Sequence, residues 1–216
     1  RDLHSFPTRR SSDLLDTLED LANAVNAALR HANMPVHSID DVRMFVGNGV
    51  KKLMERAIPG GEHNPEFDST YQYFRKYYAA HCKENTKLYP GIWELLGDLK
   101  KCGIKIAIVS NKMDPAVKIL NNDYFSGMMD AALGESEAVP KKPAPDMVLK
   151  AMEELGVTKD EAVYVGDSDV DIKTAENCGL PCISVTWGFR NTEFLLEHGA
   201  THLVNTPAEI LKLVSE

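Results

Sequence analysis

Three carboxylates follow a short apolar stretch in the second half of the chain. The stretch Val163–Asp171 reads Val-Tyr-Val-Gly-Asp-Ser-Asp-Val-Asp, which places acids at Asp167, Asp169 and Asp171. In an open α/β sheet, ligands bind beyond the carboxyl ends of the strands, where this spacing puts the acids. If a helix begins near Asp169, the carboxylates of Asp167 and Asp171 overlook one spot. The alternative is an ordinary helix N-terminus, in which the acids are a cap and first-turn charges.

Other polar side chains follow a second apolar run. Ser110 and Asn111 come directly after a strand expected at 104–109 and offer a hydroxyl and an amide to a phosphate oxygen. Lys142 lies in the proline-rich segment 140–145, where residues before proline are biased towards extended backbone, so its ammonium has a stiff support. A solvated surface lysine is the alternative for this residue.

These groups complement one another chemically. Asp167 and Asp171 offer the oxygen ligands of Mg²⁺, an ion usually held by one or two carboxylates with substrate phosphate and water in the other positions. We therefore predict a phosphoryl-transfer site with Asp167 and Asp171 as metal ligands. Ser110 and Lys142 are its predicted catalytic residues, and Asn111 is predicted to bind substrate.

The first part of the chain has only helical patterns. Residues 14–29 place leucine and valine on one face, and Ser38 is a candidate N-cap for a second helix. Further helical patterns cover 51–57 and 69–81. We expect an all-helical cap domain at 16–86, with residues 14–15 leading into it.

After Tyr89-Pro-Gly91 the pattern changes to alternating helix and strand. Expected helices are 92–101, 145–155 and 172–177, and expected strands are 104–109, 128–133, 162–166, 182–186 and 202–204. Such alternation predicts a parallel sheet with helices on both faces. The predicted fold class is thus α/β, a doubly wound, Rossmann-like parallel sheet at 87–216 with the helical cap inserted before it.

Composition limits the classes of partner. The chain has 216 residues, 44% of them hydrophobic, and a net charge of −8, without the basic runs of a nucleic-acid surface. It lacks an apolar stretch long enough to span a membrane and the apolar centre of a signal peptide, so we expect a cytoplasmic protein. No oligomeric state is indicated. Cysteines at positions 82, 102, 178 and 182 form no CxxC pair and are expected to be reduced structural thiols.

Three motifs resemble those of the haloacid-dehalogenase-like (HAD) hydrolase superfamily. They are the second, third and fourth motifs of that superfamily, in order, at Ile106–Asn111, Lys142–Pro145 and Val163–Asp171. Other stretches resemble its phosphoglycolate phosphatase branch, which carries a small helical cap: Leu14–Leu21, Val46–Gly49, Tyr89–Gly91 and Val185–Phe189. The resemblance runs from Leu14 to the C-terminus.

The resemblance implies an activity. It implies a Mg²⁺-dependent phosphatase of small phosphate monoesters, with 2-phosphoglycolate as the expected substrate. It also implies an aspartate nucleophile, an aspartyl-phosphate intermediate and a second aspartate as acid and base.

Residues 1–13 depart from the family pattern. The first motif of the superfamily would read Asp-x-Asp-Gly-Thr, but the nucleophile position holds Arg9 and the acid/base position holds Ser11. Arginine stays protonated and only donates hydrogen bonds, and a serine without a base is a poor proton shuttle. Asp13 is a poor substitute because its segment lacks a strand pattern. We therefore predict that the chain as it stands is inactive.

The same segment affects the predicted sheet. Residues 1–13 show no period of 2 or 3.6, so the first core strand is expected to be missing or malformed. That strand would lie in the middle of a parallel sheet, where strands are normally apolar. The residues from Phe6 to Leu14 are also what a common sequencing adapter encodes in one reading frame. Our hypothesis is that an assembly artefact has replaced the original segment and its catalytic motif.

Substrate-binding candidates come from two loops. Gly47, Asn48 and Gly49 lie in the expected cap, and Arg190 is a candidate partner for a substrate carboxylate. Loop and helix-cap roles are the alternative for all four. A sugar-phosphate mutase or another HAD phosphatase would keep the same site, and a non-catalytic relative would only bind phosphate or a partner. A dehalogenase needs no metal, so the paired acids argue against that activity.

Overall fold

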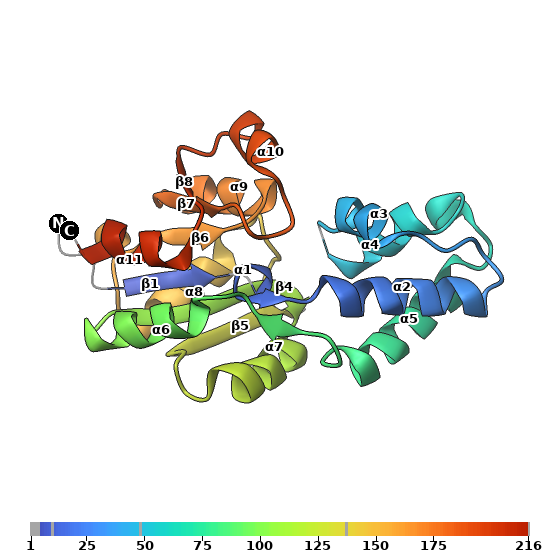
Figure 1. The fold of residues 1–216 in the computed structure, drawn as a ribbon, viewed down its shortest axis with the longest axis horizontal. Helices are drawn as coiled ribbons and strands as arrows, with labels where there is room; N and C mark the ends of the chain where they lie inside the picture. The colour runs from blue at the N-terminus through green and yellow to red at the C-terminus, as the bar shows by residue number, and fades with distance from the viewer. Residues whose placement is uncertain (1–4, 10, 48, 137, 216) are drawn as a thin grey trace. The chain divides into compact units, whose positions relative to one another are not determined.

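The computed structural model describes residues 5–9, 11–47, 49–136 and 138–215 (Figure 1). It divides the chain into two compact units. We call Arg1–Leu14 with Leu88–Glu216 the core unit, and Leu15–Lys87 the helical unit.

Parallel strands form the centre of the core unit. The strands are β1 (Ser5–Arg9), β4 (Lys105–Met113), β5 (Ala131–Glu135), β6 (Tyr164–Gly166), β7 (Cys182–Val185) and β8 (His202–Val204). Two parallel ladders have the orders β1-β4-β5 and β6-β7-β8. Strand β1 packs beside β6, so the ladders adjoin in the middle of the core (Figure 1).

The core unit also contains helices, several of which pack on these strands. They are α1 (Ser11–Leu14), α6 (Ile92–Lys101), α7 (Asp114–Leu120), the π-helix η2 (Asn121–Phe125), α8 (Asp146–Leu155), the 3-10 helix η3 (Lys159–Glu161), α9 (Asp169–Cys178), α10 (Thr192–Glu197) and α11 (Pro207–Ser215). Helix α8 packs on β1, β4 and β5, α9 packs on β6 and β7, and α6 packs on α11. The alternation of strand and helix confirms the predicted doubly wound α/β class.

Strand β1 corrects one expectation. The segment expected to lack a strand forms a five-residue parallel strand against β4, with Ser5 opposite Lys105 and Pro7 opposite Ala107. The strand is therefore not missing, although its register shifts between Pro7 and Arg9. Strand pairing uses backbone groups, so an extended backbone can pair without a strand-like side-chain pattern. Proline, which has no N–H, fits such an irregular position.

Strand β4 is longer than its apolar run. We expected a strand at 104–109, with Ser110 and Asn111 after it, but β4 continues to Met113. Its ladder with β5 is regular up to Val109 opposite Leu133, and it is interrupted until Met113. The residues in that irregularity can aim their side chains away from the regular pleat, as in a bulge.

The helical unit contains α2 (Leu18–His31), α3 (Ile39–Phe45), α4 (Val50–Ala57), the 3-10 helix η1 (Gly61–His63) and α5 (Phe67–His81). The two-residue strand β2 (Leu15–Asp16) begins this unit and pairs with β3 (Lys87–Leu88), which spans its boundary with the core unit. Ser38 caps α3 as predicted, through a capping box with Asp41. In the parts of the chain that the structure describes, no helix is long and apolar enough to cross a membrane.

A buried carboxylate joins the beginning and the end of the helical unit. Asp20, in the first turn of α2, is 3% exposed. Its Oδ1 accepts hydrogen bonds from the backbone N–H and side-chain amide of Asn85, both at 2.9 Å. Its Oδ2 accepts from the backbone N–H of Thr86 at 2.9 Å and from the Thr86 hydroxyl at 2.7 Å. Hydrogen bonds to a charged acceptor are stronger than neutral ones, so this contact fixes the returning chain to α2.

Replacing Asp20 tests this contact. We expect Asp20→Ala to lower the free energy of unfolding of the helical unit by about 3 kcal/mol, because several donors lose their charged acceptor. Amide hydrogen exchange at Asn85 and Thr86 should speed up with it. The matched control is Glu19→Ala, since Glu19 is an exposed acid in the same helical turn. Equal effects of the two substitutions on stability and exchange would contradict the role of Asp20.

Candidate active site

Two of the acids lie at the carboxyl end of β6. Asp167 directly follows the strand, and Asp171 lies in the first turn of α9, which begins at Asp169. Both side chains are fully buried, with 0% of Asp167 and 0% of Asp171 exposed. The N-cap of α9 is Ser168, not an acid, and its side chain makes no capping hydrogen bond. The helix-terminus alternative is thus met in part, because Asp169 and Asp171 are first-turn charges although the N-cap itself is not an acid.

Lys142 is buried, not solvated. It is 1% exposed, and its Nζ lies 3.0 Å from Asp171 Oδ1, forming an ion pair whose two side chains are both 0% exposed. The same ammonium donates to the backbone oxygen of Val109 at 3.0 Å and to the hydroxyl of Tyr164 at 2.9 Å. The surface alternative for this lysine is thus wrong, because its positive charge is satisfied by a carboxylate and other acceptors inside the core.

Asp171 is the centre of this network. Its Oδ1 accepts from Lys142 and from the Tyr164 hydroxyl, at 3.0 and 2.9 Å. Its Oδ2 accepts from the Ser168 hydroxyl at 2.6 Å. A carboxylate has about four lone-pair positions, so these contacts still permit a further ligand. The predicted role of Asp171 as a metal ligand stays a prediction.

Asp167 has different surroundings. Its Oδ2 accepts the backbone N–H of Phe189 at 2.9 Å. A side chain at Gly188 would collide with the carboxyl group of Asp167, and one at Gly166 would collide with that of Asp171. Both positions therefore need glycine, which lets backbone approach the two acids closely. Sequence reasoning used Gly166 only as a strand end and did not use Gly188 in this way.

Asn111 supports Lys142 through its backbone. The Asn111 Nδ2 donates to the Lys142 carbonyl at 3.0 Å, and the Lys142 N–H donates to Asn111 Oδ1 at 2.9 Å. These contacts position the backbone of Lys142, and the predicted binding of substrate by Asn111 stays a prediction. The neighbouring Ser110 is 2% exposed, and its hydroxyl accepts the N–H of Lys112 at 3.2 Å.

The predicted nucleophile and acid/base positions lie at the end of β1. Arg9 is the last residue of the strand and pairs with Ile108 of β4, and Ser11 begins α1. Their side chains lie outside the described part of the structure. Asp13, in α1, is 1% exposed, and its backbone oxygen accepts the indole N–H of Trp187 at 2.9 Å.

Arg190 lies near the side chains of Asp169 and Phe194 in the core unit. Its Nε lies 4.0 Å from Asp169 Oδ1, and its guanidinium lies 4.9 Å from the centre of the Phe194 ring. The side chain is 11% exposed. Its predicted partner, a substrate carboxylate, would have to compete with Asp169.

The remaining candidates belong to the helical unit. Gly47 has φ 133°, and its carbonyl accepts from Arg56 Nη1 at 3.4 Å. Gly49 has φ 90° and is the N-cap of α4. These positive φ angles favour glycine, as a helix-helix corner requires. Asn48 lies outside the described residues. The structure thus collects Ser110, Asn111, Lys142, Asp167, Asp171 and Arg190 in the core unit, and the two glycines in the other.

The donor set suits Mg²⁺ but is small. Asp167 and Asp171 are buried carboxylates on adjacent elements, and carboxylate oxygens are ligands of this ion. Across the described ranges, no group of three or more His, Cys, Asp and Glu side chains could hold a metal. The two acids fit the ion as part of a site that substrate and water would complete.

Cys182 adjoins this acidic region. Burial, and to a smaller extent the nearby charge of Asp171, raise the pKa of its thiol to about 12. A thiol with such a pKa stays protonated at neutral pH and is a poor nucleophile. All four cysteines are free, as predicted.

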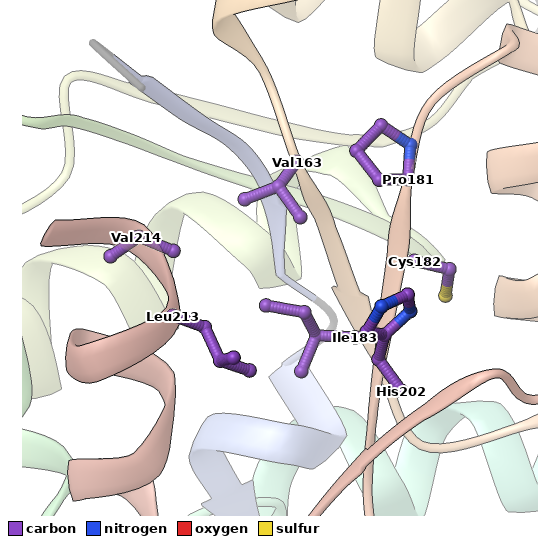
Figure 2. Close-up of a pocket in the computed structure, with 7 residues that line it drawn as sticks. All are labelled: Val163, Pro181, Cys182, Ile183, His202, Leu213 and Val214. Carbon is purple, nitrogen blue, oxygen red and sulfur yellow. The ribbon is translucent and has the colours of Figure 1, made fainter. Parts of the chain in front are cut away.

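An apolar pocket of about 170 Å³ lies elsewhere in the core unit (Figure 2). Its lining includes Val163, just before β6, with Cys182 and His202, the first residues of β7 and β8. The pocket therefore opens at the amino ends of these strands, whereas Asp167 follows the carboxyl end of β6. Figure 2 shows side chains of α11 on its other wall. Because it contains neither the acids nor Lys142, it is not the candidate active site.

Known proteins are similar to this chain in sequence and fold. A family model described as haloacid dehalogenase-like hydrolase matches residues 13–185. Phosphoglycolate phosphatase of Yersinia pestis is 34% identical over 188 residues, which are 83% of this chain and 79% of that protein. The corresponding enzyme of Aquifex aeolicus is 34% identical over 178 residues, covering 82% and 81% of the two chains.

Solved structures agree with this match. A crystal structure from Lactobacillus delbrueckii, proposed to be a phosphoglycolate phosphatase, has a TM-score of 0.95 and 34% identity, covering 100% of this chain and 99% of that one. The fold, the order of the motifs and the sequence identity thus all indicate the same family over most of the chain. The chain belongs to the haloacid dehalogenase-like hydrolases, in the phosphoglycolate phosphatase branch of this phosphoric monoester hydrolase family.

Proposed function

We propose that the intact enzyme is a Mg²⁺-dependent phosphatase with 2-phosphoglycolate as substrate, and that this chain lacks its nucleophile. The observation that carries the proposal is the buried Lys142–Asp171 pair, next to Asp167 at the carboxyl end of β6. Named relatives that are 34% identical act, by their names, on phosphoglycolate. The arrangement of charges suits a dianionic phosphate with a bound cation.

In the proposed reaction, Lys142 would neutralise phosphate charge and the Ser110 hydroxyl would donate to a phosphate oxygen. Asp167, assisted by Asp171, would hold Mg²⁺. When bound, that ion supplies Lewis-acid stabilisation of phosphoryl oxygens. These contacts act most strongly where charge develops in the transition state.

The covalent steps require acids at positions 9 and 11, where this chain has Arg9 and Ser11. An aspartate at position 9 would attack phosphorus as the ester P–O bond breaks, and an acid at position 11 would protonate the departing alkoxide. Water, deprotonated by the same residue, would then cleave the aspartyl phosphate and release inorganic phosphate. Arg9 cannot attack phosphorus, because its guanidinium stays protonated and has no nucleophilic lone pair.

We propose that the helical unit is the cap that selects the substrate. Gly47, Asn48 and Gly49 are its candidate contacts, and Arg190 is the candidate contact from the core unit. The alternatives are a sugar-phosphate mutase or another phosphatase of the family, which would use the same core residues. Arg9 at the nucleophile position favours one further candidate, a relative that binds phosphate without hydrolysing it.

Restoring the acids tests the catalytic proposal. We expect the present chain to hydrolyse 2-phosphoglycolate no faster than a protein-free blank. Arg9→Asp with Ser11→Asp should give Mg²⁺-dependent release of inorganic phosphate, at a rate at least ~10³-fold higher, because it supplies both a nucleophile and a proton shuttle.

The control for this experiment is Arg9→Asn with Ser11→Asn, which also removes the arginine charge but adds no carboxylates. Inorganic phosphate release is measured with and without Mg²⁺ over a panel of small phosphate esters. Turnover by the unchanged chain, or equal rates for the Asp and Asn pairs, would contradict the proposal. A preference for another ester would support a different member of the family.

Cation binding can be tested on the present chain. Asp167→Asn should weaken Mg²⁺ binding at least ~10-fold in calorimetry, because an amide is neutral and a weaker ligand for a hard cation. Asp169→Asn is the matched control, since Asp169 is a partly exposed acid of the same segment whose removal should change affinity less than ~2-fold. Similar losses for both variants would indicate general attraction by negative charge instead of ligation.

A further inference from the structure

Tyr164 lies in the middle of the core unit with its hydroxyl beside the candidate site. It is the first residue of β6 and is 0% exposed. Its ring belongs to a buried apolar cluster with Val148, Ala151 and Ala175, among others. A buried phenol hydroxyl needs a hydrogen-bond partner, since burying it unpaired is unfavourable.

The partners of this hydroxyl are two charged groups. It lies 2.9 Å from Lys142 Nζ and 2.9 Å from Asp171 Oδ1, and these two atoms are 3.0 Å apart. The three atoms therefore form a nearly equilateral triangle inside the core. No solvent reaches these side chains, since Tyr164 and Asp171 are 0% exposed and Lys142 is 1% exposed.

The chemistry fixes the direction of each hydrogen bond. A lysine ammonium only donates, and an ionised carboxylate only accepts. The phenol has one hydrogen, so it donates to Asp171 while its oxygen accepts from Lys142. A hydroxyl is suited to this position because it both donates and accepts, and a phenylalanine of nearly the same shape can do neither.

We propose that Tyr164 is a positioning residue for the candidate site, because its hydroxyl fixes the Lys142 ammonium and the Asp171 carboxylate in one relative arrangement. The direct ion pair alone leaves the ammonium free to swing about the carboxylate oxygen. The third group removes that freedom, and the Val109 carbonyl at 3.0 Å holds the ammonium from the end of the regular part of β4. The network thereby joins β4 and β6 to the first turn of α9.

The ring and the hydroxyl have separate roles. The ring packs in the core and lies 5.7 Å, centre to atom, from Lys142 Nζ, and phenylalanine would keep both contacts. Only the hydroxyl contacts the carboxylate. Tyr164→Phe therefore separates a positioning role from simple core packing.

The test is an NMR measurement of the Lys142 ammonium group in the present chain. In protein labelled with ¹⁵N-lysine, we expect a resolved ammonium signal whose hydrogens exchange slowly with water. The signal is assigned to Lys142 by its loss in Lys142→Met. In Tyr164→Phe the signal should shift and its exchange should accelerate about 10-fold, the size expected for loss of one hydrogen bond involving charge. Tyr71→Phe is the matched control, since it removes a hydroxyl from a partly exposed tyrosine of α5 in the helical unit.

Two outcomes would overturn the proposal. One is an unchanged ammonium signal and exchange rate in Tyr164→Phe, and the other is no protected lysine signal in the unchanged chain. If Tyr164→Phe fails to fold, the unchanged chain still decides the question. A hydrogen-bonded Tyr164 hydroxyl proton with a nuclear Overhauser effect to the Lys142 ammonium supports the arrangement, and its absence contradicts it.

The catalytic consequence rests on the proposed function. In the chain with aspartates at positions 9 and 11, Tyr164→Phe should lower kcat for 2-phosphoglycolate about 10-fold and change KM less than ~2-fold, because a fixed ammonium acts mainly on the transition state. An inactive restored chain would refute the phosphatase proposal while the ammonium signal still tests the positioning role. A rise in KM of about 10-fold with an unchanged kcat would refute the catalytic consequence.

Discussion

The buried ion pair between Lys142 and Asp171 is the interaction on which the candidate site depends. Both side chains are 0% exposed, so folding must remove two charges from water. That desolvation is unfavourable by several kcal/mol per ion unless geometry and additional hydrogen bonds compensate for it. The compensation comes from separate elements: the end of the regular part of β4 gives a carbonyl, β6 gives a phenol, and the N-cap of α9 gives a hydroxyl. Asn111 then holds the backbone of the lysine through two further bonds. The ion pair is therefore stable only when these elements are in register, which makes site geometry and core packing a single constraint.

This coupling explains why the polar residues of three separate motifs converge. If one partner were lost, the other charge would be left buried and unpaired, which destabilises a protein far more than loss of a surface ion pair. The same reasoning applies to the glycines beside the acids. A side chain at Gly166 would collide with Asp171, and one at Gly188 would collide with Asp167, so both positions are restricted to glycine by the neighbouring carboxyl groups.

In the helical unit, Asp20 follows a related principle, since one buried carboxylate accepts hydrogen bonds from residues 65 and 66 positions later in the chain. Buried acids thus organise both units.

Local patterns in the sequence predicted much of the fold and part of the site. The alternation of apolar runs and helices predicted the α/β class, and the expected strand at 202–204 coincides with β8. The start of α9 at Asp169 was the condition for bringing two acids together, and it holds. Side chains whose surroundings depend on distant segments were harder to predict. For Lys142 a surface position stayed open as an alternative, because its carboxylate partner lies 29 residues away in the sequence. Tyr164 was considered only as part of an apolar strand, since nothing local indicates what its hydroxyl contacts. The continuation of β4 through Ser110 and Asn111 was missed because polar residues usually end such a run.

Strand β1 shows how far backbone structure and chemistry can be separated. A position between two strands offers backbone partners or packing on both sides, so a segment can become extended there even when its side-chain pattern does not favour a strand. Here β1 pairs with β4 and packs beside β6, although it includes Pro7 and its register shifts before Arg9. Backbone pairing fixes where residue 9 lies in the sheet, but the reaction depends on the side chain at that position. An arginine there leaves the proposed phosphate-binding residues with their mutual contacts, because their network involves Val109, Lys142, Tyr164, Ser168 and Asp171. Binding and covalent chemistry in the proposed enzyme thus rest on different parts of the sequence, and only the second requires an acid at the end of β1.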